Sequence, residues 1–241
     1  MQYSTFAAID IGSYDVILEI FEISKKQGIR SVDKICHRME LGKDTYTLGK
    51  IRPEMEEELC RVLADFVRIM EGYRVDDYRA TASSAISEAS NSLYVLGKIH
   101  QLTGLSVTVL SNSEQRFLSY KALAAMEDNF NKIIEKGTAI LDLDGGSFQI
   151  SLFDKDALVT TQNIRMGSLR IRERLAGIQS ETEHYEEMVE ELIWNEVSSF
   201  KKMYLKDRKI ENIMLIGDVF TDSVYQNIER KNDKNHFPRK L

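Results

Sequence analysis

Two stretches of the sequence place an acidic residue, glycine and serine directly after a short apolar run. The first is Ala7-Ala8-Ile9-Asp10-Ile11-Gly12-Ser13, and the second is Ile140-Leu141-Asp142-Leu143-Asp144-Gly145-Gly146-Ser147. Glycine lets consecutive backbone N–H groups gather in a concave loop that suits a phosphate group. A neighbouring carboxylate can hold a divalent cation directly or through water. One such loop is weak support for a site, because glycine-rich turns join many strands. Two matched loops predict a phosphate-binding cleft.

The competing interpretation is structural. Asp10 and Asp142 could simply end their strands, since aspartate favours turns. The presence of a second loop with the same pattern favours the functional interpretation over this one.

The composition limits the classes of protein to consider. With 43% hydrophobic residues, a chain of 241 residues can bury a substantial core. A formal net charge of −6 gives no general attraction for nucleic acid or an anionic membrane, so neither is expected as a partner. Two cysteines and four scattered histidines make a disulfide framework or a zinc site improbable. No apolar run has membrane-spanning length and no signal peptide is recognised, so the expected class is a soluble cytoplasmic α/β protein.

The first half of the sequence predicts a strand-rich start followed by alternating helices and strands. Strands are expected over residues 6–10, 16–21, 30–38, 78–82 and 107–110. A loop is expected between Gly42 and Gly49. Helices are expected from Pro53 to Gly72, over 88–102 with Leu93, Leu96 and Ile99 facing inward, and from a Ser111 or Ser113 cap to about Met126.

The second half repeats this order of elements. Strands are expected over 138–141, 147–153, 158–163 and 213–216, with helices over 168–175, 183–204 and 221–228. The long helix is expected to bury Tyr185, Met188, Val189, Leu192, Val197 and Phe200. The repeated order predicts an internal duplication into subdomain I (1–128) and subdomain II (129–241). Because the polar tail 232–241 reads as a cut linker, subdomain II is expected to be truncated at its C-terminal end.

Several ordered motifs together resemble the exopolyphosphatase/guanosine pentaphosphate phosphatase (Ppx/GppA) family, over essentially the whole chain. The opening loop fits A-x-D-x-G-S, and the second loop fits D-x-G-G-G-S. The other matches are Leu41-Gly42, Ala82 to Asn91 for A-T-S-A-x-R-x-A-x-N, Ser111 to Gln115 for S-G-x-E-E, and Arg165-Met166-Gly167. The resemblance implies an α/β fold in which a ribonuclease H-like unit is duplicated, as in actin/hexokinase-type ATPases, with a cleft between two subdomains.

The resemblance also implies a reaction. The family uses water and Mg²⁺ to release the terminal phosphate of polyphosphate or guanosine pentaphosphate. It implies Asp142 and Asp10 as metal ligands, and Glu114 or Gln115 at the position of the general base. It implies phosphate contacts from Gly12, Ser13, Ser83, Ser84, Gly145, Gly146, Ser147 and Arg165. The expected ligand is polyphosphate, a guanosine polyphosphate or another phosphorylated small molecule, and a homodimer is left open.

The departures from the family pattern fall on its charged roles. Gln115 stands where the base glutamate is expected, Ser87 replaces an arginine, and Phe148-Gln149 replaces Thr-Glu. Asp144 replaces the first of three glycines. General-base help is typically worth ~10²–10⁴-fold, so these changes predict a phosphate-binding protein with weak or lost hydrolysis.

Two other functions stay open. The first is a fully active exopolyphosphatase that uses Glu114 as its base. The second is a non-catalytic interaction module that keeps only the fold, which a cleft filled by Phe148 and Tyr14 would favour. Glu114-Gln115 and Ser83-Ser84 also fit the pattern of helix caps without any catalytic role.

Overall fold

The structure is a computed structural model that describes residues 3–127, 129–177, 184–205 and 208–217. The chain forms two compact units, Met1–Gln115 and Arg116–Leu241, which are described separately below. The two units divide inside a helix, while the boundary of the sequence repeat near residue 128 stays a prediction. The helix expected over 221–228 and the tail 232–241 lie outside the described residues.

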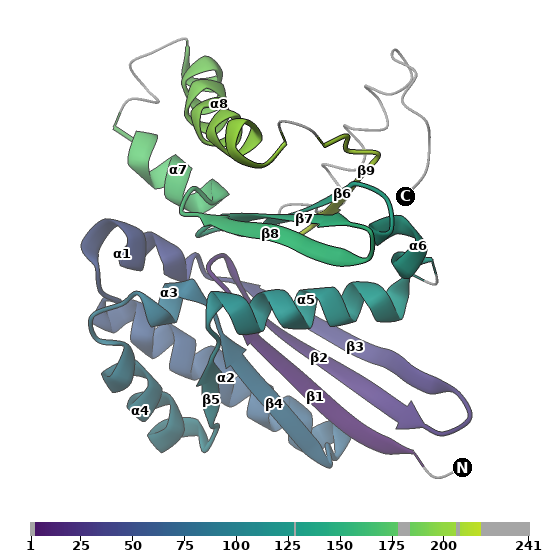
Figure 1. The fold of residues 1–241 in the computed structure, drawn as a ribbon. Coiled ribbons are helices and arrows are strands. Elements are labelled where there is room, and N and C mark those ends of the chain that lie inside the picture. Colours follow the sequence, from purple (N-terminus) through teal and green to yellow (C-terminus); the bar gives the residue numbers. More distant parts are fainter. Residues whose placement is uncertain (1–2, 128, 178–183, 206–207, 218–241) are drawn as a thin grey trace. The chain divides into compact units, whose positions relative to one another are not determined.

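The first unit is built on a five-stranded sheet in the order β3-β2-β1-β4-β5 (Figure 1). β1 pairs antiparallel with β2 and parallel with β4, β2 pairs antiparallel with β3, and β4 pairs parallel with β5. The strands are β1 (Ser4–Ile11), β2 (Asp15–Ser24), β3 (Gly28–Arg38), β4 (Asp77–Ala82) and β5 (Val107–Val109). The helices are α1 (Leu41–Leu48), α2 (Pro53–Tyr73), α3 (Ser84–Ser87) and α4 (Ser92–Thr103), with α5 (Asn112–Met126) starting in this unit.

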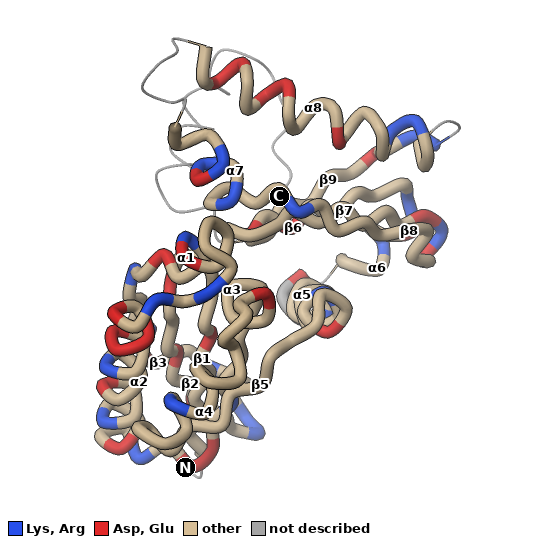
Figure 2. The backbone as a smooth tube through the Cα atoms, turned by 90° about the vertical axis from the view of Figure 1, so that its left-hand side faces the viewer, with Lys and Arg blue, Asp and Glu red and all other residues tan. Residues whose placement is uncertain are grey.

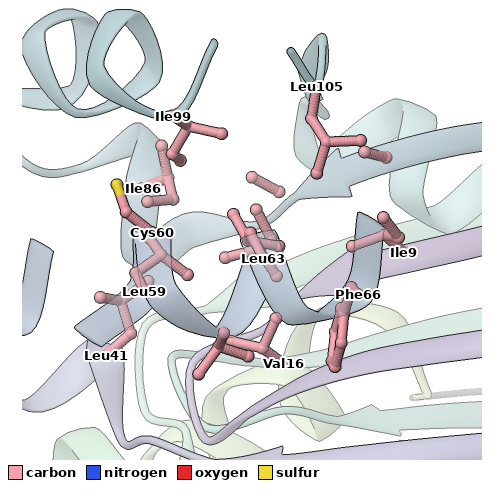
Figure 3. Close-up of a cluster of buried hydrophobic side chains, with 14 of the residues drawn as sticks. Ile9, Val16, Leu41, Leu59, Cys60, Leu63, Phe66, Ile86, Ile99 and Leu105 are labelled. Atoms are coloured by element: carbon pink, nitrogen blue, oxygen red, sulfur yellow. The ribbon is translucent and has the colours of Figure 1, made fainter. Parts of the chain in front are cut away.

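The core of the first unit lies between the sheet and helices α2 and α4. Alternate residues of β1, among them Ile9 and Ile11, are fully buried against the apolar stripe of α2 that includes Leu63 and Phe66 (Figure 3). Period-two alternation sends the residue between them, Asp10, to the opposite face of the sheet. Burial of alternate residues therefore fixes which face of β1 presents the acidic side chain.

Two expectations for the first unit are wrong. The segment between Gly42 and Gly49 is helix α1, because the buried Asp44 carboxylate binds Arg52 and anchors this segment beside the start of α2. The helix expected over 88–102 starts later, as α4 at Ser92, and residues 88–91 are not helical. Leu93 is 84% exposed rather than inward, whereas Ile99 is buried and Leu96 packs against the core as expected.

The second unit repeats the pairing scheme in a four-stranded sheet, in the order β8-β7-β6-β9. β6 pairs antiparallel with β7 and parallel with β9, and β7 pairs antiparallel with β8. The strands are β6 (Thr138–Leu143), β7 (Phe148–Asp154), β8 (Ala157–Ile164) and β9 (Asn212–Ile216), and the helices are α6 (Phe130–Ile134), α7 (Ser168–Leu175) and α8 (Tyr185–Tyr204). The order of strand pairing matches β3-β2-β1-β4, as a duplication predicts.

Helices cover both faces of this second sheet. Phe148, Ile150 and Leu152 of β7 pack on the side of α8 with Phe200, and Phe153 packs on the other side with α5 and α6. Of the six residues expected to be buried on the long helix α8, Phe200 is buried and the other five are partly buried. Acidic residues mark its first turn and lysines its last turn, which suits the helix dipole (Figure 2).

No helix among the described residues is long and apolar enough to cross a membrane.

Candidate functional site

The end of β1 carries the first candidate carboxylate, just before the loop with Gly12 and Ser13. The side chain of Asp10 reaches the surface, yet the protein around it displaces enough water that burial raises the pKa of its carboxyl. The Thr81 hydroxyl, 3.4 Å from Asp10 Oδ1, donates a hydrogen bond that acts in the opposite direction on this pKa. Asp10 is therefore a carboxylate whose ionised form would gain from a nearby cation.

Gly12 is required in this loop by close packing of the backbone. Its N–H donates to the Asp15 carbonyl at 2.9 Å, and a Cβ at this position would lie only 2.9 Å from the same oxygen. Gly12 has no left-handed φ, so its conformational freedom is not what the turn uses. Any side chain here would push β1 and β2 apart at the point where they join.

Three hydroxyl groups meet beside this loop. The buried Ser13 hydroxyl lies 2.7 Å from the Tyr46 hydroxyl, which lies 2.8 Å from Ser84 Oγ. Ser83 turns away from this contact, because its hydroxyl and its N–H both reach the Ile11 carbonyl. The structure thus brings together Ser13 and Ser84, two of the predicted phosphate residues, through a tyrosine that the motif comparison missed.

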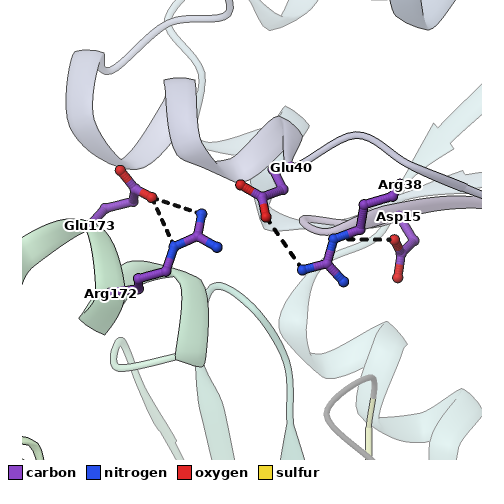
Figure 4. A network of polar contacts seen from close by, with 5 residues as sticks. All are labelled: Asp15, Arg38, Glu40, Arg172 and Glu173. Carbon is purple, nitrogen blue, oxygen red and sulfur yellow. Dashed lines mark hydrogen bonds and ion pairs between the residues drawn. The ribbon is translucent and has the colours of Figure 1, made fainter. Parts of the chain in front are cut away.

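Charged side chains flank the same turn. Arg38 lies 3.9 Å from Asp15 and 3.3 Å from Glu40 (Figure 4). Its guanidinium also stacks 4.4 Å from the centre of the Tyr14 ring. Tyr14 is therefore held against Arg38 within its own unit. Figure 4 also shows a separate pair in the second unit, Arg172 with Glu173 at 2.8 Å.

In the second unit, Asp142 lies on the face of the sheet that carries α5. Its neighbours Leu141 and Leu143 pack on the opposite face, and the Ser119 hydroxyl of α5 donates to Asp142 Oδ2 at 3.2 Å. Burial raises the pKa of Asp142, and the bond from Ser119 offsets part of that rise. Gln149 stands directly opposite on β7 and is itself buried.

The loop from Asp144 to Ser147 is bound to the first turn of α7 through its carbonyl groups. The Asp144 carbonyl accepts from Ser168 N–H at 3.2 Å, and the Gly145 carbonyl accepts from Leu169 and Arg170 N–H at 3.0 and 3.1 Å. The Gly146 carbonyl accepts from Arg170 Nε at 2.8 Å. In a trans peptide the N–H points opposite to the C=O. The N–H groups of Gly145, Gly146 and Ser147 are therefore directed away from these α7 donors.

Two further glycines allow this arrangement. A Cβ on Gly167 would lie 2.4 Å from the Gly145 carbonyl and from Ser147 N, so α7 can approach the loop only with glycine there. Gly217 has φ +120°, and a Cβ on it would lie 2.1 Å from the Leu143 carbonyl. Glycine at position 217 is thus needed for β9 to pass the end of β6.

The other predicted residues of the second unit have varied surroundings. Ser147 Oγ accepts from Asn163 Nδ2 at 3.2 Å, and Arg165 is exposed between β8 and α7. Phe148 packs in the core on the α8 side, so its position does not support the interpretation in which it fills a cleft. An aromatic residue at this position serves the core because strand alternation turns it away from Gln149.

Glu114 forms a capping box at the start of α5. Its carboxylate accepts from the Ser111 N–H at 2.9 Å and from the Ser111 hydroxyl at 2.7 Å, and Ser111 Oγ accepts from Glu114 N–H at 3.3 Å. These hydrogen bonds, the backbone one first, lower the pKa of Glu114. Gln115 follows in the same turn, where its N–H bonds to the Ser111 carbonyl at 2.9 Å. The geometry favours the capping interpretation of Glu114, because a lower pKa makes a weaker base.

The donors available for a metal are sparse. Within the described part of the chain, no three His, Cys, Asp or Glu side chains cluster in a way that could hold an ion. Mg²⁺, however, is usually held by one or two carboxylates together with waters and substrate phosphates. Asp142 offers such a carboxylate next to a loop whose amides suit phosphate, and Asp10 offers another in the first unit. The residues present fit an Mg²⁺ ion held largely by phosphate and water.

The family assignment follows from comparison with known proteins. The model of the Ppx/GppA phosphatase family matches residues 19–239. The chain belongs to this family. The membership predicted from the ordered motifs is confirmed.

The individual relatives have low sequence identity to this chain and are longer than it. A bifunctional 3-dehydroquinate synthase/phosphatase of Fusobacterium nucleatum is 21% identical over 238 residues, covering 93% of this chain and 34% of that protein. Exopolyphosphatase 1 of Mycobacterium leprae is 25% identical over 144 residues, covering 59% of this chain and 41% of that protein. The chain therefore spans well under half the length of either relative.

Solved structures establish the fold. An exopolyphosphatase from Cytophaga hutchinsonii has a TM-score of 0.71 at 18% identity, covering 98% of this chain and 73% of that chain. An Aquifex aeolicus member of the Ppx/GppA family has a TM-score of 0.68 at 22% identity, covering 94% of this chain and 71% of that chain. The predicted α/β class, a duplicated ribonuclease H-like fold of the actin/hexokinase type, is confirmed. The cleft between the two loops stays a prediction.

Sequence reasoning missed residues whose role depends on neighbours distant in the chain. Tyr46 and Ser119 lie in segments next to the family motifs rather than inside them, and Asn163 lies inside a predicted strand. One signal was available for Ser119: it lies on the predicted helix that begins with the motif residue Glu114, five residues further along. No comparable signal marks Tyr46, because its segment was expected to be a loop.

Proposed function

We propose that this chain binds the phosphate groups of polyphosphate or a guanosine polyphosphate, with weak or no hydrolysis of the terminal phosphate. The observation that carries the proposal is the loop from Asp144 to Ser147. Its carbonyl groups bind the first turn of α7, so successive amide N–H groups are directed away from that helix. An oxyanion is the partner that such a run of amides suits best.

Mg²⁺ is the cation that this proposal includes. Asp142 would hold it directly or through water, and Asp10 would play the same part in the first unit. When bound, the ion neutralises negative charge on the phosphate groups. The raised pKa of both carboxyls supports this assignment, because a cation offsets the penalty of keeping a partly desolvated carboxylate ionised.

The proposal of weak hydrolysis rests on the state of the base position. Glu114 is engaged with Ser111 in a helix cap, and Gln115 cannot accept a proton from water at neutral pH. Ser87 is exposed at the end of α3 and brings no charge. Gln149 is a neutral amide beside Asp142. Positioning groups for phosphate are thus retained, while groups that would move a proton or add positive charge are not.

Calorimetric titration of the protein with tripolyphosphate, with and without Mg²⁺, tests the proposal. We expect saturable binding that Mg²⁺ strengthens and that Asp142→Asn weakens at least tenfold. Asp154→Asn is the matched control, because Asp154 lies at the end of β7 away from the loop; this variant should bind as the parent protein does. No saturable binding, or equal loss in both variants, would refute phosphate binding at this loop.

Membership in a phosphatase family favours a second candidate, a fully active exopolyphosphatase that uses Glu114. Phosphate release from polyphosphate distinguishes the two. Rapid Mg²⁺-dependent release that Glu114→Gln abolishes would establish the active enzyme and exclude the weak one.

A further inference from the structure

Helix α8 carries an exposed tryptophan at its centre. Trp194, the one tryptophan of the chain, is 62% exposed, although tryptophan is on average highly buried in folded proteins. A different side of α8 attaches the helix to its own unit, because Phe200 and Tyr204 pack in the core against β7. Packing within the second unit therefore accounts for one side of α8 and does not account for the exposed Trp194.

Opposite charges flank Trp194 at equal distances along the helix. Glu187 comes seven residues before it, and Lys201 comes seven residues after it. Because seven residues are close to two helical turns, these three side chains lie along one line that spans about 21 Å. Glu186 and Lys202 lie next to this line, and all four charged residues are exposed. Figure 2 shows acidic residues towards one end of α8 and lysines at the other.

The helix dipole explains the signs of these charges but not the whole pattern. Glutamates near the N-terminus and lysines near the C-terminus stabilise an isolated helix, which needs no exposed tryptophan midway between them. A second copy of α8 supplies the missing reason. In an antiparallel pair with a two-fold axis at Trp194, Glu187 lies opposite Lys201 of the partner subunit, and Glu186 lies opposite Lys202 of the partner subunit. The same contacts repeat at the other end of the pair.

A hollow beside Trp194 gives the partner's indole a place to bind. The hollow has a volume of about 440 Å³ and is lined by Glu186, Val189, Glu190, Ile193, Trp194 and Val197. A two-fold axis at Trp194 brings the partner's Trp194 to the same level of the helix as this hollow. Tryptophan in an apolar pocket near the centre of an interface is a common source of binding energy between proteins.

We propose that α8 is a self-association surface, on which a second copy of this chain docks antiparallel about a two-fold axis at Trp194. The occupant is a second copy because the charge pattern of α8 is complementary to its own reversal, whereas a parallel pair would oppose glutamate to glutamate. Glu187 bonds to His184 at 2.8 Å within its own subunit, but both side chains are exposed, and an exposed pair of this kind contributes little that would prevent exchange. This surface is independent of the proposed phosphate site.

The size of the contact predicts a weak dimer. Two crossing helices cover less surface than the ~1,200–2,000 Å² of a stable interface, so we expect a dissociation constant on the order of 10⁻⁵–10⁻⁴ M. The ion pairs lie at the rim of the contact, where salt screens them, so added salt should weaken the dimer.

Sedimentation equilibrium over roughly 1–500 µM protein tests the proposal. The parent protein should show a monomer–dimer equilibrium, and Trp194→Ala should weaken it at least tenfold. Because Trp194 is the one tryptophan of the chain, its fluorescence emission should also shift to shorter wavelength as the dimer forms. A monomer throughout this range, or a dimer that Trp194→Ala leaves unchanged, would overturn the proposal.

Two charge-reversed variants test the antiparallel arrangement. One combines Glu186→Lys with Glu187→Lys, and the other combines Lys201→Glu with Lys202→Glu. Each alone should dimerise at least tenfold more weakly than the parent protein, because like charges then oppose each other at both ends of the pair. Mixed together, the two variants should form a heterodimer, because every contact again joins opposite charges. Variants that had merely lost their fold could not give this result.

The matched control combines Lys25→Glu with Lys26→Glu. These two adjacent lysines are exposed on the turn after β2, and their reversal changes the net charge as much as reversal of the two lysines of α8 does. The control should therefore dimerise as the parent protein does. Equal weakening in the control, or failure of the two reversed variants to pair on mixing, would overturn the antiparallel contact.

Discussion

Exchanging the residue types at positions 114 and 115 separates the two interpretations of Glu114. If Glu114 serves only as a helix cap, Glu114→Gln should leave phosphate release unchanged, because glutamine still accepts a hydrogen bond from the Ser111 N–H. Gln115→Glu should raise the rate, since it places a carboxylate where the family resemblance expects the base. Successive helical residues point about 100° apart, so position 114 cannot replace 115 without a local shift.

The expected magnitude follows from what the site lacks. A positioned general base contributes ~10²–10⁴-fold, and the lower end applies here because Ser87 and Gln149 still bring no charge. Gln115→Glu should therefore raise phosphate release about 100-fold above the rate of the parent protein. The triple variant with Ser87→Arg and Gln149→Glu should exceed it.

The cap itself has a measurable signature. Ser111→Ala removes the hydroxyl that bonds to Glu114 in both directions and should lower the free energy of unfolding by about 1 kcal/mol, or ~2–4 °C in melting temperature. Because Ser111 lowers the pKa of Glu114, the ionised cap stabilises the fold above the ordinary value of 4.5. This contribution is lost as the pH falls through the lowered pKa, so the difference between Ser111→Ala and the parent should shrink in acid.

The assay is release of phosphate from polyphosphate and from guanosine pentaphosphate in Mg²⁺, alongside thermal melts of each variant. Hydrolysis by the parent protein that Glu114→Gln abolishes without a change in melting temperature would refute this reasoning. It would show that the capped carboxylate takes the proton after all.

Three further outcomes are expected. Asp142→Asn should raise the free energy of unfolding at neutral pH, because burial raises the pKa of this carboxyl in the folded protein and its ionised form costs stability. This gain should disappear as the pH falls below the pKa of the folded state towards the ordinary value of 3.8. Thermal melts at a series of pH values will show it. Gly167→Ala should lower the free energy of unfolding by about 1–3 kcal/mol in denaturant titrations, because its Cβ meets backbone at 2.4 Å, whereas Gly97→Ala, with open space inside α4, should raise it by about 0.5–1 kcal/mol. Asn91→Ala should lower the free energy of unfolding by about 2–4 kcal/mol, since the substitution removes three hydrogen bonds, one of them to the buried Glu56. An unchanged unfolding midpoint would contradict this.

Local patterns were sufficient for the strands and for most helices. Alternation placed β1, β2, β6 and β7, and proline with an apolar stripe placed α2 from Pro53. The pattern failed at α1, a short helix whose segment was expected to be a loop between Gly42 and Gly49. There, the bond between the buried Asp44 and Arg52 outweighs local preference. It also placed the start of α4 too early, at 88 instead of Ser92, where the preceding Asn91 side chain bonds to the backbone of Ile51.

The sequence by itself determined that this protein has two matched loops with a carboxylate, glycine and serine, and that it belongs to a phosphatase family. That information is local, since each loop lies within a few consecutive residues. Tertiary structure decided which segments the loops contact. Carbonyl groups of the second loop bind α7, and Tyr46 joins Ser13 to Ser84. Tertiary structure also decided that Phe148 belongs to the core. These contacts join segments far apart in the chain, and only folding brings such donors and acceptors within hydrogen-bond distance.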